Sequence, residues 1–306
     1  MLEFPDNTDA ATVYFQWTTV ILQSTGTILP PQKQQKAQSC PEYIARMPPS
    51  SRWSIEHITD FRYAREVADS IRDGTCIAIA NGSYKNDFGT AQFILQAPDP
   101  LHRLKAPLRC PGDYDDACAY RSEETGLYGI GNCAKMLCEQ YNIANGKITY
   151  GCDNDTALHN SHQELVTSPK HPHFDILMAT RKVMSSCPIQ WCPQEVKGHH
   201  DNEDGDHELN IYELLNCECD EGAKAFWYFC TSIEDTQPIW EIEHEPWSLW
   251  INGKKICTKL DEAIRTAVDG RNILDYWKKK YPNGIQGVES TDWDALGKSL
   301  AAVKLS

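Results

Sequence analysis

The chain has 306 residues, with 43 acidic side chains against 29 basic ones and a formal net charge of −14. The excess of acidic side chains argues against general nucleic-acid affinity, because proteins with such affinity are typically basic. An acidic chain can still present a locally basic groove. Apolar residues make up 41% of the chain, which excludes disorder throughout. No apolar run approaches the roughly 18 residues of a membrane helix. The sequence therefore predicts a globular protein that does not span a membrane.

The cysteine content bears on the compartment. There are 13 cysteines, and the only apolar stretch near the start, Val20-Ile21-Leu22, is too short for a secretory leader. A chain of this length needs no disulfide framework. We therefore expect an intracellular protein whose thiols stay reduced.

The first part of the chain predicts a loose flank, a helix and three strands. Residues 1–51 are expected to be a flank, because residues 24–51 are rich in Pro, Gln, Lys and Ser and indicate an arm. Residues 53–73 show helical spacing of apolar side chains. Three short apolar runs separated by turn residues then predict an antiparallel meander, with strands at 76–80, 88–96 and 101–110.

Helices and strands alternate in the second part. The pattern predicts helices at 120–141, 155–160, 174–186 and 208–229, with strands at 147–152 and 188–196. A meander followed by helix-connected strands predicts an α/β fold, a mixed five-stranded sheet flanked by helices.

The last part of the chain predicts a small α+β extension. A hairpin at 247–256 turns on Asn252-Gly253. Helices are expected at 258–268 and 271–280, separated by Asp269-Gly270, and Thr291 with Asp294 predicts the start of a last helix. We expect three parts: an arm and helix at 1–70, the α/β domain at 71–233, and the hairpin with its helices at 234–306.

Three carboxylates fall on inward faces or at strand ends of this pattern. Asp153 follows a predicted strand, Glu123 shares the inward stripe of its helix, and Asp220 lies on the inward stripe of the last helix. A lone buried acid is costly, whereas converging carboxylates hold hard divalent cations such as Mg²⁺.

Five short segments occur in a characteristic order. They are Ala-Asn-Gly-Ser at 80–83, Tyr-Arg-Ser-Glu at 120–123, Gly-Cys-Asp at 151–153, Val-Lys-Gly-His at 196–199, and Asn-Cys-Glu-Cys-Asp-Glu-Gly-Ala-Lys at 216–224. Together they resemble a type 1 ribonuclease H domain, of the kind attached to reverse transcriptases of protist and algal retroelements. The resemblance implies a ribonuclease H-like fold and hydrolysis of the RNA strand of RNA–DNA hybrids with two Mg²⁺ ions, Mn²⁺ being an alternative.

The resemblance also assigns catalytic residues. It implies that Glu123, Asp153 and Asp220 are metal ligands and that His199 is a loop histidine that moves protons or assists product release. Asn81 stands where the family has its first metal-bridging Asp.

The implied substrate contacts come from Gly82, Ser83, Arg121, Lys197 and Asn216. The implied partners are an RNA–DNA hybrid and a reverse transcriptase domain, with no membrane. Further candidates for phosphate contact are Lys85, Lys170, Arg181 and Lys182.

The amide at position 81 is the main departure from the family pattern. A neutral amide in place of a carboxylate weakens metal binding and water activation together. Asn81 is consistent with an engineered substitution, with a decayed element copy, or with partial deamidation of Asn81-Gly82 to Asp. Gly222, which weakens a helix by about 1 kcal/mol relative to Ala, agrees with decay. The alternative function is an inactive module of the same fold that binds nucleic acid or a protein partner.

Two rival chemistries have weaker signals. A zinc site would draw on Cys187, Cys192, Cys217 and Cys219 with three nearby histidines, but their spacing does not match the usual zinc knuckles. A Cys–His nucleophilic pair is conceivable, although nothing in the sequence marks one cysteine as activated.

Overall fold

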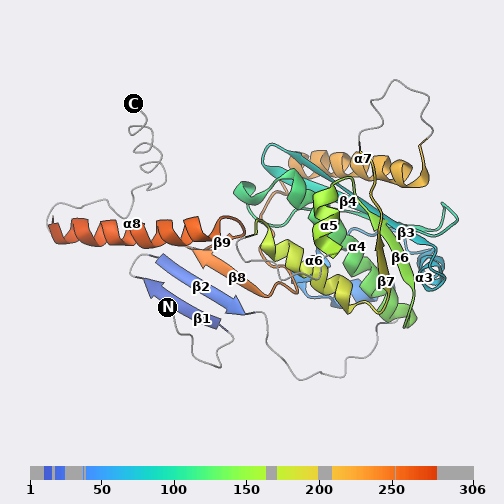
Figure 1. Ribbon diagram of the computed structural model, residues 1–306, viewed down its shortest axis with the longest axis horizontal. Helices are drawn as coiled ribbons and strands as arrows, with labels where there is room; N and C mark the ends of the chain where they lie inside the picture. Colours follow the sequence, from blue (N-terminus) through green and yellow to red (C-terminus); the bar gives the residue numbers. More distant parts are fainter. Residues whose placement is uncertain are drawn as a thin grey trace.

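The computed structural model describes residues 10–15, 18–24, 37, 39–162, 171–198, 209–251 and 253–280. The helices and strands that it describes are, in chain order, β1 (Ala10–Phe15), β2 (Thr18–Ser24), α1 (Cys40–Arg46), α2 (Pro49–Arg52), α3 (Ala64–Arg72), β3 (Cys76–Lys85), β4 (Phe88–Gln96), β5 (Arg103–Arg109), the short 3₁₀ helix η1 (Tyr114–Asp116), α4 (Ala119–Tyr141), β6 (Lys147–Gly151), α5 (Asp155–His162), α6 (Phe174–Ser186), β7 (Gln190–Pro193), α7 (Ile211–Ser232), β8 (Trp247–Ile251), β9 (Lys254–Ile256) and α8 (Leu260–Lys280). Figure 1 shows their arrangement. The helix predicted to begin near Thr291 lies outside the described residues.

The central sheet has the strand order β5-β4-β3-β6-β7. Strands β3, β4 and β5 form the antiparallel meander, and β6 and β7 are added parallel to β3. The predicted mixed five-stranded sheet flanked by helices is therefore confirmed. The predicted helix at 174–186 has the bounds of α6, and the other predicted core elements differ by a few residues at their ends.

Helices cover both faces of this sheet (Figure 1). Successive side chains of a strand point to opposite faces. Ala78 and Ala80 of β3 belong to the main core, which contains the inward residues of α4, whereas Ile79 packs in a second cluster with Leu215 and Cys219 of α7. The alternation places the side chain of Asn81 on the α7 face.

The N-terminal region is more ordered than the sequence predicts. The prediction of a loose arm over 1–51 is wrong for α1 and α2, and α1 contributes Cys40 and Ile44 to the main core. Strand β1 pairs with β2, and β2 pairs with β8 on its other side. The predicted helix at 53–73 is α-helical only over Ala64–Arg72, because residues 53–57 form turns that bury Trp53 and Ile55.

Contacts cross both predicted domain boundaries. The Trp53 ring stacks on Tyr128 of α4 at a centroid distance of 5.3 Å. Its indole Nε1 donates to the carbonyl oxygens of Ser50, at 2.8 Å, and of Glu241, at 3.2 Å. One hydrophobic core thus contains residues from before position 71 and from after position 233.

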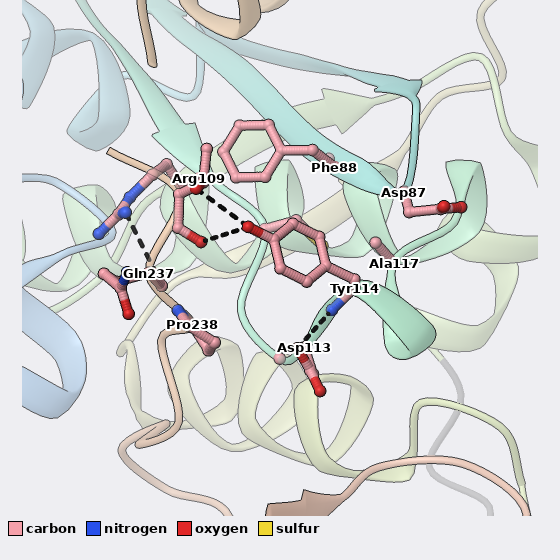
Figure 2. Close-up of a pocket in the computed structure, with 12 residues that line it drawn as sticks. Asp87, Phe88, Arg109, Asp113, Tyr114, Ala117, Gln237 and Pro238 are labelled. Carbon is pink, nitrogen blue, oxygen red and sulfur yellow. Dashed lines mark hydrogen bonds between the residues drawn. The ribbon is translucent and has the colours of Figure 1, made fainter. Parts of the chain in front are cut away.

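Segment 235–239 lies against β5 and the loop that follows it. Arg109 donates to the backbone oxygen of Asp235 at 3.0 Å, and Tyr114 donates from its hydroxyl to Thr236 Oγ1 at 3.0 Å. Figure 2 shows Arg109 and Tyr114 beside Gln237 and Pro238 of this segment, around a small pocket next to Phe88. The polar contacts hold the segment that leads to the C-terminal hairpin.

The C-terminal hairpin is anchored by buried charges. The Arg121 guanidinium, on α4, donates to both carboxylate oxygens of Asp175, on α6, at 2.7 Å. Lys255 of β9 donates to Glu245 at 2.7 Å, and its Nζ lies 3.4 Å from Asp175. All four side chains are at most 5% exposed. We call Arg121, Asp175, Glu245 and Lys255 the buried ion cluster.

Two features of the C-terminal part concern the sequence predictions. The predicted hairpin is present as β8 and β9. The prediction of separate helices at 258–268 and 271–280 is wrong, because α8 continues through Asp269-Gly270. Within the described residues, no helix is both long and apolar enough to cross a bilayer.

Gly222 has a packing role. A Cβ built on it would lie 2.0 Å from Oε1 of Gln92 on β4. Gln92 is buried and donates to the backbone oxygen of Glu218 at 3.0 Å. Gly222 therefore has a packing role in this fold, because a side chain at this position would meet the end of the buried Gln92 side chain. Its interpretation as a sign of decay stays a prediction.

Candidate functional site

Three polar residues from separate parts of the fold meet at the carboxyl end of β6. Asn81 of β3 donates from Nδ2 to Asn216 Oδ1 of α7 at 3.1 Å and to Asp153 Oδ2, just after β6, at 3.3 Å. Asn216 Nδ2 also donates to Asp153 Oδ2 at 3.5 Å. An amide nitrogen carries two protons, so this orientation satisfies both, whereas the flipped amide would set an oxygen against the carboxylate.

Glu123 reaches the same region from the first turns of α4. The backbone N–H of Gly82 donates to its Oε1 at 2.8 Å. A Cβ on Gly82 would lie 2.7 Å from the Glu123 backbone nitrogen, so the strand and the helix can touch only because position 82 is glycine. Ser83, the next residue, accepts a hydrogen bond at its backbone oxygen from Ser122 at 3.4 Å.

The electrostatics of Glu123 indicate crowded negative charge. Burial raises its pKa well above the ordinary value, and the neighbouring charges of Asp153 and Asp220 raise it further, against the Gly82 hydrogen bond. Its Oε2 atom is buried and has no hydrogen-bond partner. An orphaned carboxylate oxygen beside a second carboxylate is a donor set that fits a divalent cation.

The carboxylates do not form a complete multi-ligand cage. Among the described residues, no three His, Cys, Asp or Glu side chains are grouped closely enough to hold a metal ion. Glu123 and Asp153 therefore fit one cation, with other ligands needed to complete its coordination. Of the residues considered for zinc, His199, His200 and His207 lie outside the described residues.

Asp220 lies at the edge of the site. Its side chain is 27% exposed and forms an ion pair with Lys224, four residues further along α7. Sequence reasoning missed this pair, although the spacing of four residues on one helix is a readable signal. Lys224 thus partly neutralises the carboxylate that the family resemblance makes a metal ligand.

The loop after β7 passes directly beside Asp153. A Cβ on Gly198 would lie 2.6 Å from Asp153 Oδ2, so this glycine is in close contact with the carboxylate. Lys197 precedes it and is exposed at the rim of the site. His199 and Lys170 lie outside the described residues, so their predicted roles stay predictions.

Arg121 is not available to bind substrate. It is fully buried, its guanidinium is paired with Asp175, and its Nε donates to the Pro111 oxygen at 2.6 Å. The prediction of a substrate contact at Arg121 is therefore wrong. Sequence periodicity cannot distinguish a surface arginine at a helix start from one paired with a partner 54 residues away.

Sequence reasoning also missed Glu124, which lies beside the site in the interior. Its side chain is fully buried, Tyr120 donates to its Oε1 at 3.1 Å, and its Oε2 has no partner. Burial raises the pKa of Glu124 to about 8, against the hydrogen bond from Tyr120 and the charge of Arg181. The adjacent Glu123-Glu124 pair was the available signal.

This buried acid predicts a specific pH dependence of stability. The folded-state pKa of Glu124, about 8, is above its ordinary value of 4.5, so the folded state prefers the proton and stability falls as pH rises between these values. We expect Glu124→Gln to gain stability relative to the parent chain across that window, as measured by urea unfolding at several pH values. The exposed Glu195→Gln is the matched control, and a constant difference for Glu124→Gln would contradict the prediction.

Comparisons with known proteins gave matches among solved structures alone. No family model matches the chain, and no curated protein matches it. Similar structures include the N-terminal RNase H domain of a Mycobacterium tuberculosis protein, at 11% identity, covering 52% of this chain and 97% of that one, with a TM-score of 0.35. RNase H1 from Halobacterium salinarum has 11% identity, covers 50% and 98%, and has a TM-score of 0.33. LC11-RNase H1, solved with an RNA/DNA hybrid, has 8% identity, covers 49% and 94%, and has a TM-score of 0.36.

Proposed function

We propose that this chain is a ribonuclease H-like nuclease that hydrolyses the RNA strand of RNA–DNA hybrids with a divalent cation, and that Asn81 depresses its activity. The observation that carries the proposal is the meeting of Asn81, Asp153 and Asn216, from three separate motifs, within hydrogen-bond distance of one another. Glu123, from a fourth motif, is bonded to the residue after Asn81. We further propose, on the motif resemblance, an origin in a retroelement reverse transcriptase.

Glu123 and Asp153 are the residues that would hold Mg²⁺ or Mn²⁺. The bound cation would supply charge stabilisation at the scissile phosphate and lower the pKa of a bound water. The Gly82 N–H orients the Glu123 carboxylate. The negative charges of Asp153 and Asp220 near this carboxylate favour the binding of a cation.

The reduced cleavage activity that we propose follows from the side chain of Asn81. Its Nδ2 group donates to the Asp153 oxygen, so the amide partly satisfies a carboxylate that would otherwise need a cation. The amide also adds no negative charge of its own. Asp220 contributes less than a free carboxylate would, because Lys224 is paired with it.

The hybrid substrate follows from the site's surroundings and from the resemblance. Gly82 and Ser83 are half-buried, and Lys197 is an exposed cation at the rim. Hybrids are recognised by groove shape and 2′-hydroxyl groups more than by base sequence. We expect double-stranded DNA and single-stranded RNA to be poor substrates.

A cleavage assay tests the proposal. End-labelled hybrid, RNA duplex and DNA duplex are incubated with the full chain and Mg²⁺ or Mn²⁺. We expect slow cleavage confined to the RNA strand of the hybrid, and its loss in Asp153→Asn. Cleavage that persists in Asp153→Asn would come from a contaminant or another site and would contradict the assignment.

A second candidate is a module of the same fold that binds nucleic acid or a protein without catalysis. The hydrogen bonds of Asn81 to Asp153 and Asn216 favour it, since they hold the site together without a cation. Hybrid binding by fluorescence anisotropy, with no cleavage in the parent chain or any restored variant, would support this candidate.

A further inference from the structure

Two polar side chains of β4, those of Thr90 and Gln92, are buried between the sheet and α7. In the register of the antiparallel pair, Gln92 lies opposite Asn81 and Thr90 lies opposite Ser83. Residues directly opposite each other in such a pair have neighbouring side chains on the same face of the sheet. Thr90 and Gln92 therefore lie beside the β3 residues of the candidate site, on the face that α7 covers.

Both side chains donate hydrogen bonds to the backbone of α7. The Thr90 hydroxyl donates to the carbonyl oxygen of Ala223 at 2.8 Å, and Nε2 of Gln92 donates to the carbonyl oxygen of Glu218 at 3.0 Å. In an α-helix, an interior carbonyl already accepts the N–H of the residue four positions later. The two carbonyls therefore need no further donor, and apolar side chains could fill the same space. What the two hydrogen bonds add is a fixed direction between β4 and the helix.

The spacing of the two accepting carbonyls restrains the helix at two points. Hydrogen bonds depend on angle and distance, whereas apolar contacts are not directional. The carbonyls of Glu218 and Ala223 precede and follow Asp220 in the chain and are separated by about 7.5 Å along a helix axis. Hydrogen bonds at two separate points oppose both sliding of α7 along its axis and rotation about it. They therefore fix the segment that carries Asn216 and Asp220.

Asn216 connects this restraint to the candidate site. It is buried, its Oδ1 accepts the hydrogen bond from Asn81 at 3.1 Å, and its Nδ2 donates to Asp153 Oδ2 at 3.5 Å. Because the side chain of Asn216 is short, both contacts depend on where the backbone of α7 lies. A helix that slides or rotates would carry Asn216 away from both partners.

We propose that Thr90 and Gln92 are positioning residues for the candidate site. They hold α7 in the register that brings Asn216 to Asn81, and they act on the site only through that helix. The arrangement also uses Gly222, because a Cβ there would lie 2.0 Å from Oε1 of Gln92. The positioning itself can be measured without catalysis, whereas its effect on cleavage rests on the proposed nuclease function.

Nuclear magnetic resonance of the ¹⁵N-labelled full chain tests the positioning. The double variant Thr90→Val, Gln92→Leu removes both donors and keeps side chains of similar size. We expect the side-chain amide resonances of Asn81 and Asn216 to shift in this variant, because the hydrogen bond between the two amides lengthens when α7 moves. The signals are identified by their loss in Asn81→Ala and in Asn216→Ala.

Two single variants are the controls. Thr90→Ser keeps the hydroxyl donor and should leave both resonances in place. Thr180→Val removes a buried hydroxyl that donates to the Ile176 oxygen within α6 at 2.9 Å, and it should also leave them in place. A general effect of losing a buried hydroxyl would appear in Thr180→Val as well.

Cleavage of labelled hybrid gives the functional readout. At saturating hybrid, the rate of the double variant should fall about tenfold, a moderate effect for misplaced reacting groups, while KM stays unchanged. Thr90→Ser and Thr180→Val should keep the parent rate.

Unmoved resonances of Asn81 and Asn216 in the folded double variant would overturn the proposal. So would an unchanged cleavage rate of that variant when the parent chain cleaves. If the double variant unfolds, Thr90→Val alone, which nearly keeps the parent shape, decides by the same resonances. A parent chain that cleaves no hybrid would contradict the proposed function, and the resonances would still decide whether Thr90 and Gln92 position α7.

Discussion

Asn81→Asp is expected to raise the rate of hybrid cleavage by about a hundredfold or more, the scale of a single electrostatic contribution at a phosphoryl or acyl transfer site. The new carboxylate removes the N–H donor from the Asp153 oxygen and adds a negative charge beside it. Both changes strengthen the attraction for a divalent cation. The measurement is the initial rate with labelled hybrid in Mg²⁺ and in Mn²⁺.

Thermal stability gives a readout of Asn81→Asp that does not depend on catalysis. Without metal, the added charge should destabilise the chain, because it lies beside Asp153 and has lost the hydrogen bonds of the amide. Added Mg²⁺ should raise the melting temperature of this variant more than that of the parent chain.

Two controls separate charge from the loss of the amide. Asn81→Ala removes the hydrogen bonds without adding charge and should cleave no faster than the parent chain. Asn81→Asp combined with Asp153→Asn should lose the gain. An Asn81→Asp variant with neither faster cleavage nor metal-dependent stability would contradict the nuclease proposal and leave the binding module as the better account.

Asp175→Asn is expected to lower the free energy of unfolding by about 3–5 kcal/mol, the scale for removing one partner of a buried ion pair. The change leaves Arg121 and Lys255 buried without their shared carboxylate. Burial alone would raise the pKa of Asp175, but Arg121 and Lys255 hold it well below the ordinary value. Urea unfolding at neutral pH measures the loss.

The sign of the pH dependence follows from that lowered pKa. Because the folded state prefers the charged form, Asp175 stabilises the chain at pH values above its unfolded pKa, and this contribution disappears as pH falls below it. The parent chain and Asp175→Asn should therefore become more similar in stability in acid. Asp60→Asn, which removes an exposed pair with Arg62, is the control and should leave the stability almost unchanged. Equal effects of the two changes would contradict a structural role for the buried ion cluster.

The sheet was predictable because its strands and helices follow the simple periods of local structure. The run from Cys76 and the stretch from Phe88 carry continuous apolar patterns between turn residues, and the stripe of α4 repeats at helical spacing. A meander followed by helix-connected strands then favours a mixed sheet flanked by helices.

The features that the sequence did not predict depend on contacts between residues far apart in the chain, and the local spacing of apolar residues carries no information about such contacts. Trp53 makes a proline-rich flank part of the core by stacking on Tyr128. Arg121 is interior because Asp175 is available to pair with it. Gly222 is required by the side chain of Gln92, on another element.

Most residues of the candidate site could be predicted from the sequence, but the hydrogen bonds between them could not. Motif order indicated that Asn81, Glu123, Asp153 and Asp220 would form the site. The structure brings the first three together with Asn216, an implied substrate contact, and leaves Asp220 at the edge, paired with Lys224; their roles stay predictions. The direction of the Asn81 amide could not be predicted, because it depends on which acceptors surround the nitrogen.

The buried ion cluster sets a limit on folding during synthesis. Chains fold as they emerge from the ribosome, N-terminal parts first. Arg121 and Asp175 emerge well before Lys255, the last charge of the cluster. A nascent chain that has exposed the whole five-stranded sheet still holds an incomplete set of interior charges. The buried ion cluster can therefore form completely only after the hairpin β8–β9 has been synthesised. Before that point the incompletely packed chain would be most accessible to a chaperone.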